Sequence, residues 1–173
     1  HPQIVKAIQY LRDQQETDGS WYGRWGVNYI YGTWQVLRGL RALHYDMRQP
    51  WLLRARDWLE SVQHEDGGWG ERCNTYDDPV FKGQGPSTAS QTAWALLGLI
   101  PAGEVQAPEV KAGVDYLVKT QNAQGRWDEA HFTGTGFPNH FMIRYHLYRD
   151  CFPLMALGAY VQALKTPAGD RYG

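Results

Sequence analysis

Cysteine is scarce in this sequence, and net charge and long apolar runs are nearly absent. The two cysteines, Cys73 and Cys151, lie far apart and in no metal-ligand or redox spacing, so we expect a reducing compartment and no disulfide framework. The 17 basic and 18 acidic residues leave a net charge of −1, which provides no field to attract nucleic acid. No apolar run approaches the roughly 18 residues that span a bilayer, and we expect no signal peptide.

Aromatic residues are abundant by contrast, with 8 Trp, 11 Tyr and 5 Phe, and several belong to a pattern that occurs three times. Each copy has an aromatic residue followed by Leu, then Gln, Gly and Trp at the same spacing. The copies are Tyr10, Leu11, Gln15, Gly19 and Trp21; Trp58, Leu59, Gln63, Gly67 and Trp69; and Tyr116, Leu117, Gln121, Gly125 and Trp127. Identical spacing in three copies is hard to obtain by chance and indicates a repeat architecture.

Each copy ends a segment with helical periodicity, such as Leu52, Ala55, Leu59 and Val62 on one helix face. A second helix rich in Ala, Gly and Leu is expected after each copy, at about 33–43, 87–100 and 152–164, and is expected to face inward. The predicted fold class is therefore all-α, with three α/α hairpins stacked in residues 1–164 and a tail at 165–173. Because His1 already lies within an expected helix, we expect a partial chain.

The repeated Gln, Gly and Trp have a structural interpretation. The Gly permits the left-handed backbone conformation that ends a helix. We expect the indole to stack on the Gln amide, while the amide bonds free backbone groups at a neighbouring helix end. Since such caps contribute about 0.5–2 kcal/mol each, the repeats are predicted to stabilise the fold rather than to catalyse.

The loops within the hairpins are where function is expected. The loops 22–32 and 128–150 are rich in aromatic residues, whereas 70–86 is polar. The aromatic residues are either buried anchors or the wall of a cavity that holds a cation. An aromatic face attracts positive charge by roughly 0.5–1 kcal/mol when exposed and about 2 when desolvated, and it offers the cation no nucleophile.

Carboxylates and metal ligands are less informative. Asp77 and Asp78 could form an acid pair with one raised pKa, but Asp before Pro79 is also a common turn opening, and we favour the turn. Cys73 and the six histidines have no metal-ligand spacing, so no metal site is expected.

The repeats resemble the QW motifs of squalene–hopene and oxidosqualene cyclases. Four segments resemble the bacterial squalene–hopene branch: GSWYGRWGVNYIYGT (19–33), DGGWGERCNTYDDP (66–79), STASQTAWALLGLI (87–100) and GTGFPNHFMIRYHLYRDCFPLMALGAY (134–160). The resemblance implies a larger enzyme with two α-barrel domains around a hydrophobic cavity, in which three hairpins form about half of an (α/α)6 barrel. It implies proton-initiated carbocation cyclisation of squalene to hopene or hopanol without a cofactor. It also implies peripheral attachment to the cytoplasmic face of the bacterial cell membrane and is compatible with a homodimer.

The resemblance also implies roles for individual residues. Trp25 matches a tryptophan near the acid end of the cavity, and Tyr31 matches a tyrosine that helps to hold the reprotonating water. The other cavity and cation-stabilising positions of the family match Phe137, Phe141, Ile143 (where Leu is usual), Tyr145 and Tyr148. The proton donor of the family belongs to a DxDD motif, which this sequence lacks because Thr75 precedes the Asp77-Asp78 pair at the critical position. The chain alone is therefore predicted to be inactive.

Other protein classes remain open from the sequence. Oxidosqualene cyclases share the repeats and the fold. A prenyltransferase β subunit would bind zinc through an Asp-x-Cys pair, but Glu71 stands two residues before Cys73. A carbohydrate-active α/α toroid would place carboxylates among its aromatic loops, and 22–32 has none. A non-catalytic binding module is the remaining alternative.

Overall fold

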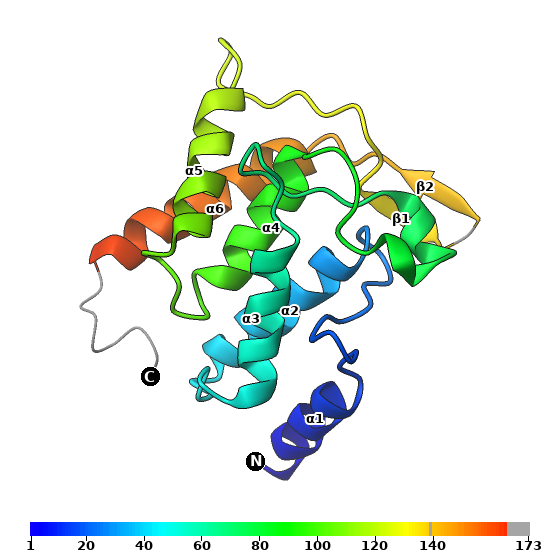
Figure 1. Ribbon diagram of the computed structural model, residues 1–173, viewed down its shortest axis with the longest axis vertical. Helices are drawn as coiled ribbons and strands as arrows, with labels where there is room; N and C mark the ends of the chain where they lie inside the picture. The colour runs from blue at the N-terminus through cyan, green and yellow to red at the C-terminus, as the bar shows by residue number, and fades with distance from the viewer. Residues whose placement is uncertain (139, 166–173) are drawn as a thin grey trace.

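The computed structural model describes residues 1–138 and 140–165, which form six α-helices that follow one another as three consecutive pairs, or hairpins (Figure 1). The hairpins pair α1 (Pro2–Asp13) with α2 (Tyr29–Ala42), α3 (Pro50–Ser61) with α4 (Ala89–Leu99), and α5 (Pro108–Thr120) with α6 (Tyr148–Lys165). The predicted helical class is confirmed. Of the predicted tail at 165–173, Lys165 is the last residue of α6 and the rest lies outside the described residues. Among the described helices, none is both long and apolar enough to cross a membrane.

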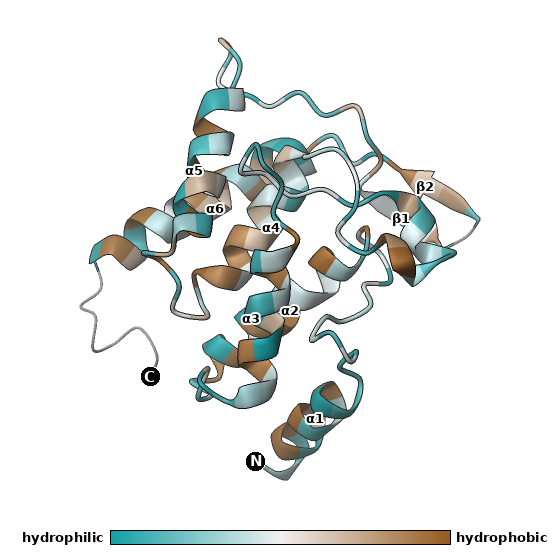
Figure 2. Ribbon diagram, in the orientation of Figure 1, coloured by the Kyte–Doolittle hydropathy of each residue, from teal (hydrophilic) through white to brown (hydrophobic). Residues whose placement is uncertain are grey.

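Helix α4 forms the centre of the hydrophobic core. All of its residues are buried, and it packs against α2, α3, α5 and α6. Its largely apolar sequence, visible in Figure 2, explains this position because a helix that is apolar all round has no face to present to water. Helix α2 likewise buries seven of its residues. The second helices of the first two repeats therefore face inward as predicted.

The outer hairpins depart from this pattern. Helix α1 buries none of its residues, and α6 buries Pro153 and Ala156 alone. Leu154 and Val161 of α6, the helix that was predicted to face inward, are 69% and 51% exposed. The inward prediction is thus wrong for α6, because the described residues contain no further hairpin to cover its apolar face.

Each repeated Trp closes the helix that precedes it. The indole Nε1–H donates to the backbone oxygen of the repeat Leu, ten residues earlier, at 2.7 Å in the first copy and 2.8 Å in the other two. The last carbonyls of a helix have no partner within it, so this bond satisfies one of them. The sequence predicted stacking of the indole on the Gln amide and missed the hydrogen bond that the indole makes.

Two of the three repeated Gln amides join their own turn to the next hairpin. Gln63 Nε2 donates to the backbone oxygens of Gly67, at 2.8 Å, and of Glu109 in the first turn of α5, at 2.9 Å. Gln15 does the same with Gly19 and with Trp51 in α3. The predicted bond to a neighbouring helix end is therefore confirmed in two copies. In the part of the chain that the structure describes, Gln121 makes the first of these bonds and not the second.

The repeated glycine allows the next helix to approach. Gly67 has φ of +84°, and a Cβ atom added there would lie 2.7 Å from the backbone oxygen of Ala112 in α5. A Cβ atom added to Gly19 would lie 2.5 Å from the backbone oxygen of Arg54 in α3. Both the turn conformation and the contact between hairpins therefore require glycine.

The long loops contain more regular structure than the sequence indicated. Helices α2 and α6 begin at Tyr29 and Tyr148, four residues before the predicted starts. The third loop contains an antiparallel pair of strands, β1 (Gly134–Phe137) and β2 (Phe141–Ile143), with a bulge in its register. The second loop contains two short 3-10 helices, Cys73–Tyr76 and Pro79–Phe81. Strands this short show no readable alternation, which is why an all-α interpretation missed them.

We predict that Gln63→Ala lowers the free energy of unfolding by about 1–2 kcal/mol, because it removes two hydrogen bonds to buried turns. The matched control is Gln121→Ala, which removes one bond at an exposed site and should cost less than about 1 kcal/mol. Urea denaturation of both variants measures the difference. Equal losses would contradict the assigned link between hairpins.

Candidate functional site

The loop before α2 lies along the strand pair, which brings two aromatic segments together. The backbone oxygen of Trp25 accepts a hydrogen bond from Thr135 N at 2.9 Å. The ring of Trp25 meets that of Phe137 edge-on, with centroids 6.3 Å apart, and Phe137 meets Phe141 at 5.8 Å. These three rings form a first aromatic cluster from segments more than 100 residues apart in the sequence.

A second aromatic cluster lies where α6 begins. Tyr145 and Tyr148 stack with centroids 4.5 Å apart, and Tyr148 contacts the buried Trp94 at 5.9 Å. Trp94 in turn meets Tyr31 at 4.9 Å and Phe152 at 5.5 Å. Tyr31 is therefore held by the central helix as well as by its own.

Two paired glycines join the clusters. Gly26 and Gly134 form an isolated antiparallel bridge. A Cβ added to Gly26 would lie 2.2 Å from the ring of Tyr31, and one added to Gly134 would lie 2.7 Å from the ring of Tyr145. Ile143 lies opposite Gly134 in the strand pair. The structure thus brings all seven residues that the resemblance singled out into one region.

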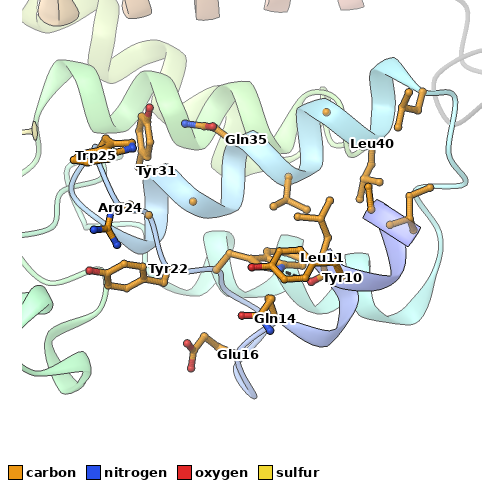
Figure 3. Close-up of a pocket in the computed structure, with 18 residues that line it drawn as sticks. Tyr10, Leu11, Gln14, Glu16, Tyr22, Arg24, Trp25, Tyr31, Gln35 and Leu40 are labelled. Atoms are coloured by element: carbon orange, nitrogen blue, oxygen red, sulfur yellow. Dashed lines mark hydrogen bonds between the residues drawn. The ribbon is translucent and has the colours of Figure 1, made fainter. Parts of the chain in front are cut away.

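An apolar groove of about 750 Å³ lies between α1 and α2 and reaches part of this region. Trp25 and Tyr31 lie at one end of the groove and Leu40 at the other (Figure 3). Its volume is in the range of small-molecule sites. The remaining five candidate residues, Phe137, Phe141, Ile143, Tyr145 and Tyr148, are not part of its lining. The groove and the aromatic region therefore overlap at Trp25 and Tyr31 but do not coincide.

The aromatic region is open to the outside. Trp25, Phe137, Phe141 and Tyr145 are 48%, 56%, 50% and 39% exposed. Large rings gathered on a surface are typical of a face that binds another molecule or another part of the protein. The guanidinium of Arg24 lies over the ring of Trp25, 5.2 Å from its centroid, so one of these rings already makes a cation–π contact.

Two buried glutamates are site residues that the sequence did not reveal. Glu71 Oε2 accepts hydrogen bonds from the backbone N–H groups of Asn28, at 3.2 Å, and Ile30, at 3.1 Å, where α2 begins. Glu129 accepts from Ser90 N and Ser90 Oγ in the first turn of α4. Both stand two residues after a repeat Trp. The recurrence of Glu two residues after the repeat Trp is the sequence signal that could have identified both residues.

Burial controls the ionisation of these carboxyl groups. Desolvation raises the pKa of Glu71 to about 6, against the opposing effect of the hydrogen bonds from Ile30 and Asn28. Desolvation also raises the pKa of Glu129, and the bonds from Ser90 oppose it. The two groups therefore bind protons more tightly in the folded protein than in the unfolded chain.

The other polar candidates have structural roles. Asp78 accepts a hydrogen bond from Val80 N at 2.9 Å and begins a 3-10 helix, as expected of a turn. Among the described residues, no three His, Cys, Asp or Glu side chains gather in a group that could hold a metal ion.

Consecutive helix pairs with repeated Gln, Gly and Trp turns define an α/α-repeat protein. A model described as the squalene-hopene cyclase C-terminal domain matches residues 1–162. The chain belongs to this family.

Sequence identities to named relatives support this family assignment. The chain is 53% identical, over 91% of its length, to a probable squalene–hopene cyclase of Sinorhizobium fredii, and 51% identical, over 94%, to the squalene–hopene cyclase of Alicyclobacillus acidocaldarius. It is 46% identical, over 94%, to the dammaradiene synthase of the fern Dryopteris crassirhizoma. The chain spans about a quarter of the length of these relatives, 24% of the first and 26% of the other two.

We predict that Gly26→Ala displaces the ring of Tyr31 and costs about 1–3 kcal/mol, because the added methyl group overlaps that ring. The matched control is Gly39→Ala in α2, where no atom lies within 4 Å of the added Cβ. That substitution should be neutral or stabilise by up to about 1 kcal/mol, since Ala favours helix. Denaturation measures both effects, and a neutral Gly26→Ala would contradict the packing described.

The raised pKa of Glu71 predicts a pH dependence of stability. The folded protein holds the proton more tightly than the unfolded chain, so the contribution of Glu71 is fully present below pH 4.5 and is lost as the pH rises to about 6. We expect the stability of the wild type relative to Glu71→Gln to fall by about 2 kcal/mol across this interval. Denaturation from pH 4 to 7 tests this, with the exposed Glu65→Gln as control. A constant difference between wild type and Glu71→Gln would refute it.

Proposed function

We propose that the full-length protein is a triterpene cyclase that converts squalene to hopene or hopanol through a cascade of carbocations. In this proposal the described chain supplies part of the aromatic wall of the reaction cavity and the repeats that stabilise it. The observation that carries the proposal is a group of four large aromatic side chains that are each more than a third exposed, Trp25, Phe137, Phe141 and Tyr145. The ring of Phe137 contacts those of Trp25 and Phe141, and the ring of Tyr145 lies against Gly134.

The chemistry supports this role. Rings around a dry cavity stabilise a carbocation by roughly 2 kcal/mol or more each and do not capture it. The buried carboxyl groups of Glu71 and Glu129 are bonded to helix N-termini rather than presented with the rings. The proton that starts the cascade would come from a part of the protein outside this chain.

Several features of the proposal rest on the resemblance and the relatives. The named squalene–hopene cyclases favour hopene as the product, whereas the relative named dammaradiene synthase favours dammaradiene. We further propose uptake of squalene at a membrane surface, with the protein attached peripherally to the cytoplasmic face, and assembly as a homodimer.

We predict that Phe137→Ala and Phe141→Ala in the full-length protein divert squalene to partly cyclised products. Loss of about 2 kcal/mol of cation stabilisation slows the affected step roughly 30-fold. Incubation with squalene in detergent, followed by gas chromatography–mass spectrometry, measures the products. Phe132→Ala is the control, because Phe132 is 49% exposed in the same loop and lies outside both ring clusters. A folded wild type without conversion of squalene would refute the proposed function.

A further inference from the structure

The segment that carries Trp25 and Tyr31 is held from the interior by polar side chains. Glu71, of which 3% is exposed, reaches the first turn of α2 and accepts from Asn28 N and Ile30 N. These N–H groups have no acceptor within the helix. A single carboxylate oxygen therefore satisfies two backbone donors between Trp25 and Tyr31.

The same segment is tied at two further points. Asn28 Oδ1 accepts from Gly23 N at 3.0 Å, and Asn28 Nδ2 donates to Thr75 Oγ1 at 3.3 Å. The hydroxyl of Tyr76 donates to the backbone oxygen of Gly26 at 2.8 Å. Gly26 and Asn28, which follow Trp25, are thus bonded to the 3-10 helix of the second loop, and Gly23, which precedes Trp25, is bonded to Asn28.

Gln91 connects this arrangement to the central helix. Its Nε2 donates to the backbone oxygens of Val27 and Glu71, both at 2.9 Å, and its Oε1 accepts from Glu71 N at 3.1 Å. Gln91 lies in α4, where it is almost completely buried. The loop with Trp25, the loop with Glu71 and the core helix therefore share one buried network.

We propose that Glu71 is a positioning residue for the aromatic wall, which holds Trp25 and Tyr31 in place through the first turn of α2. The proposal rests on the proposed function. Buried backbone N–H groups that keep their acceptor favour one conformation, whereas an N–H left without an acceptor disfavours it. Small displacements of groups around a reacting centre change the course of a reaction. A displaced ring would stabilise the cation at the wrong position and lead to early loss of its proton.

Comparison with the other repeats favours a particular role for Glu71. Glu129 stands at the corresponding position and bonds Ser90 in α4. Gly23 occupies that position in the first repeat and is itself bonded by Asn28. Of the two glutamates, Glu71 is the one bonded to the helix whose first turn contains Tyr31.

The test uses the full-length protein and two readouts, amide hydrogen exchange by mass spectrometry and the proportions of squalene products. Glu71→Leu, which removes the carboxylate oxygen that accepts both backbone bonds, should accelerate exchange in residues 22–31 about tenfold and increase the share of partly cyclised products. Glu71→Gln keeps one acceptor oxygen and should restore both readouts toward the wild type. Gln63→Leu is the matched control, because it loses two backbone hydrogen bonds away from the wall. It should destabilise the protein without changing either readout.

The outcomes separate this proposal from the proposed function. A wild type that does not cyclise squalene would refute the proposed function. Faster exchange in residues 22–31 of Glu71→Leu would still support the positioning role in that case. Unchanged exchange and unchanged product proportions in Glu71→Leu would overturn the positioning role. If Glu71→Leu does not fold, Tyr76→Phe removes one bond to Gly26. Its exchange in residues 22–31 should rise about threefold, and no rise would overturn the proposal.

Discussion

The arrangement of the hairpins depends on one glutamine side-chain amide at each junction between consecutive repeats. Gln15 and Gln63 each donate to their own turn and to the first turn of the next hairpin. The glycine of the same turn leaves no room for a side chain between them. Because the amide and the glycine act at the same point, the distance between neighbouring hairpins is set by hydrogen-bond length rather than by the less specific packing of apolar side chains.

This regular spacing buries α4 from all sides and makes it the support for the site. Trp94 in α4 contacts Tyr31 and Tyr148, while Gln91 in the same helix bonds the loop that precedes α2. The ring contacts of Trp94 and the buried hydrogen bonds of Gln91 thus come from the same helix, α4. The aromatic region lies on loops, but its position is decided by the core.

The buried glutamates show how polar groups are tolerated in such a core. Glu71 and Glu129 are removed from water, which raises the pKa of each. Each is bonded to N–H groups at a helix N-terminus, where a carboxylate is favoured by the unpaired donors and by the helix dipole. The desolvation of these groups is therefore partly offset by the ends of α2 and α4 that they stabilise.

The sequence by itself determined the three helical repeats, the Gln, Gly and Trp turns and the aromatic character of two loops, because helical periodicity and motif spacing are local properties of the chain. Through a resemblance, it also indicated Trp25, Phe137 and Tyr148 as candidate site residues. Only the tertiary structure decided that Trp25 meets Phe137, that Glu71 bonds α2, and that the apolar face of α6 is exposed. These facts depend on contacts between residues far apart in the chain and on which elements are present to cover a face, and no local pattern encodes either.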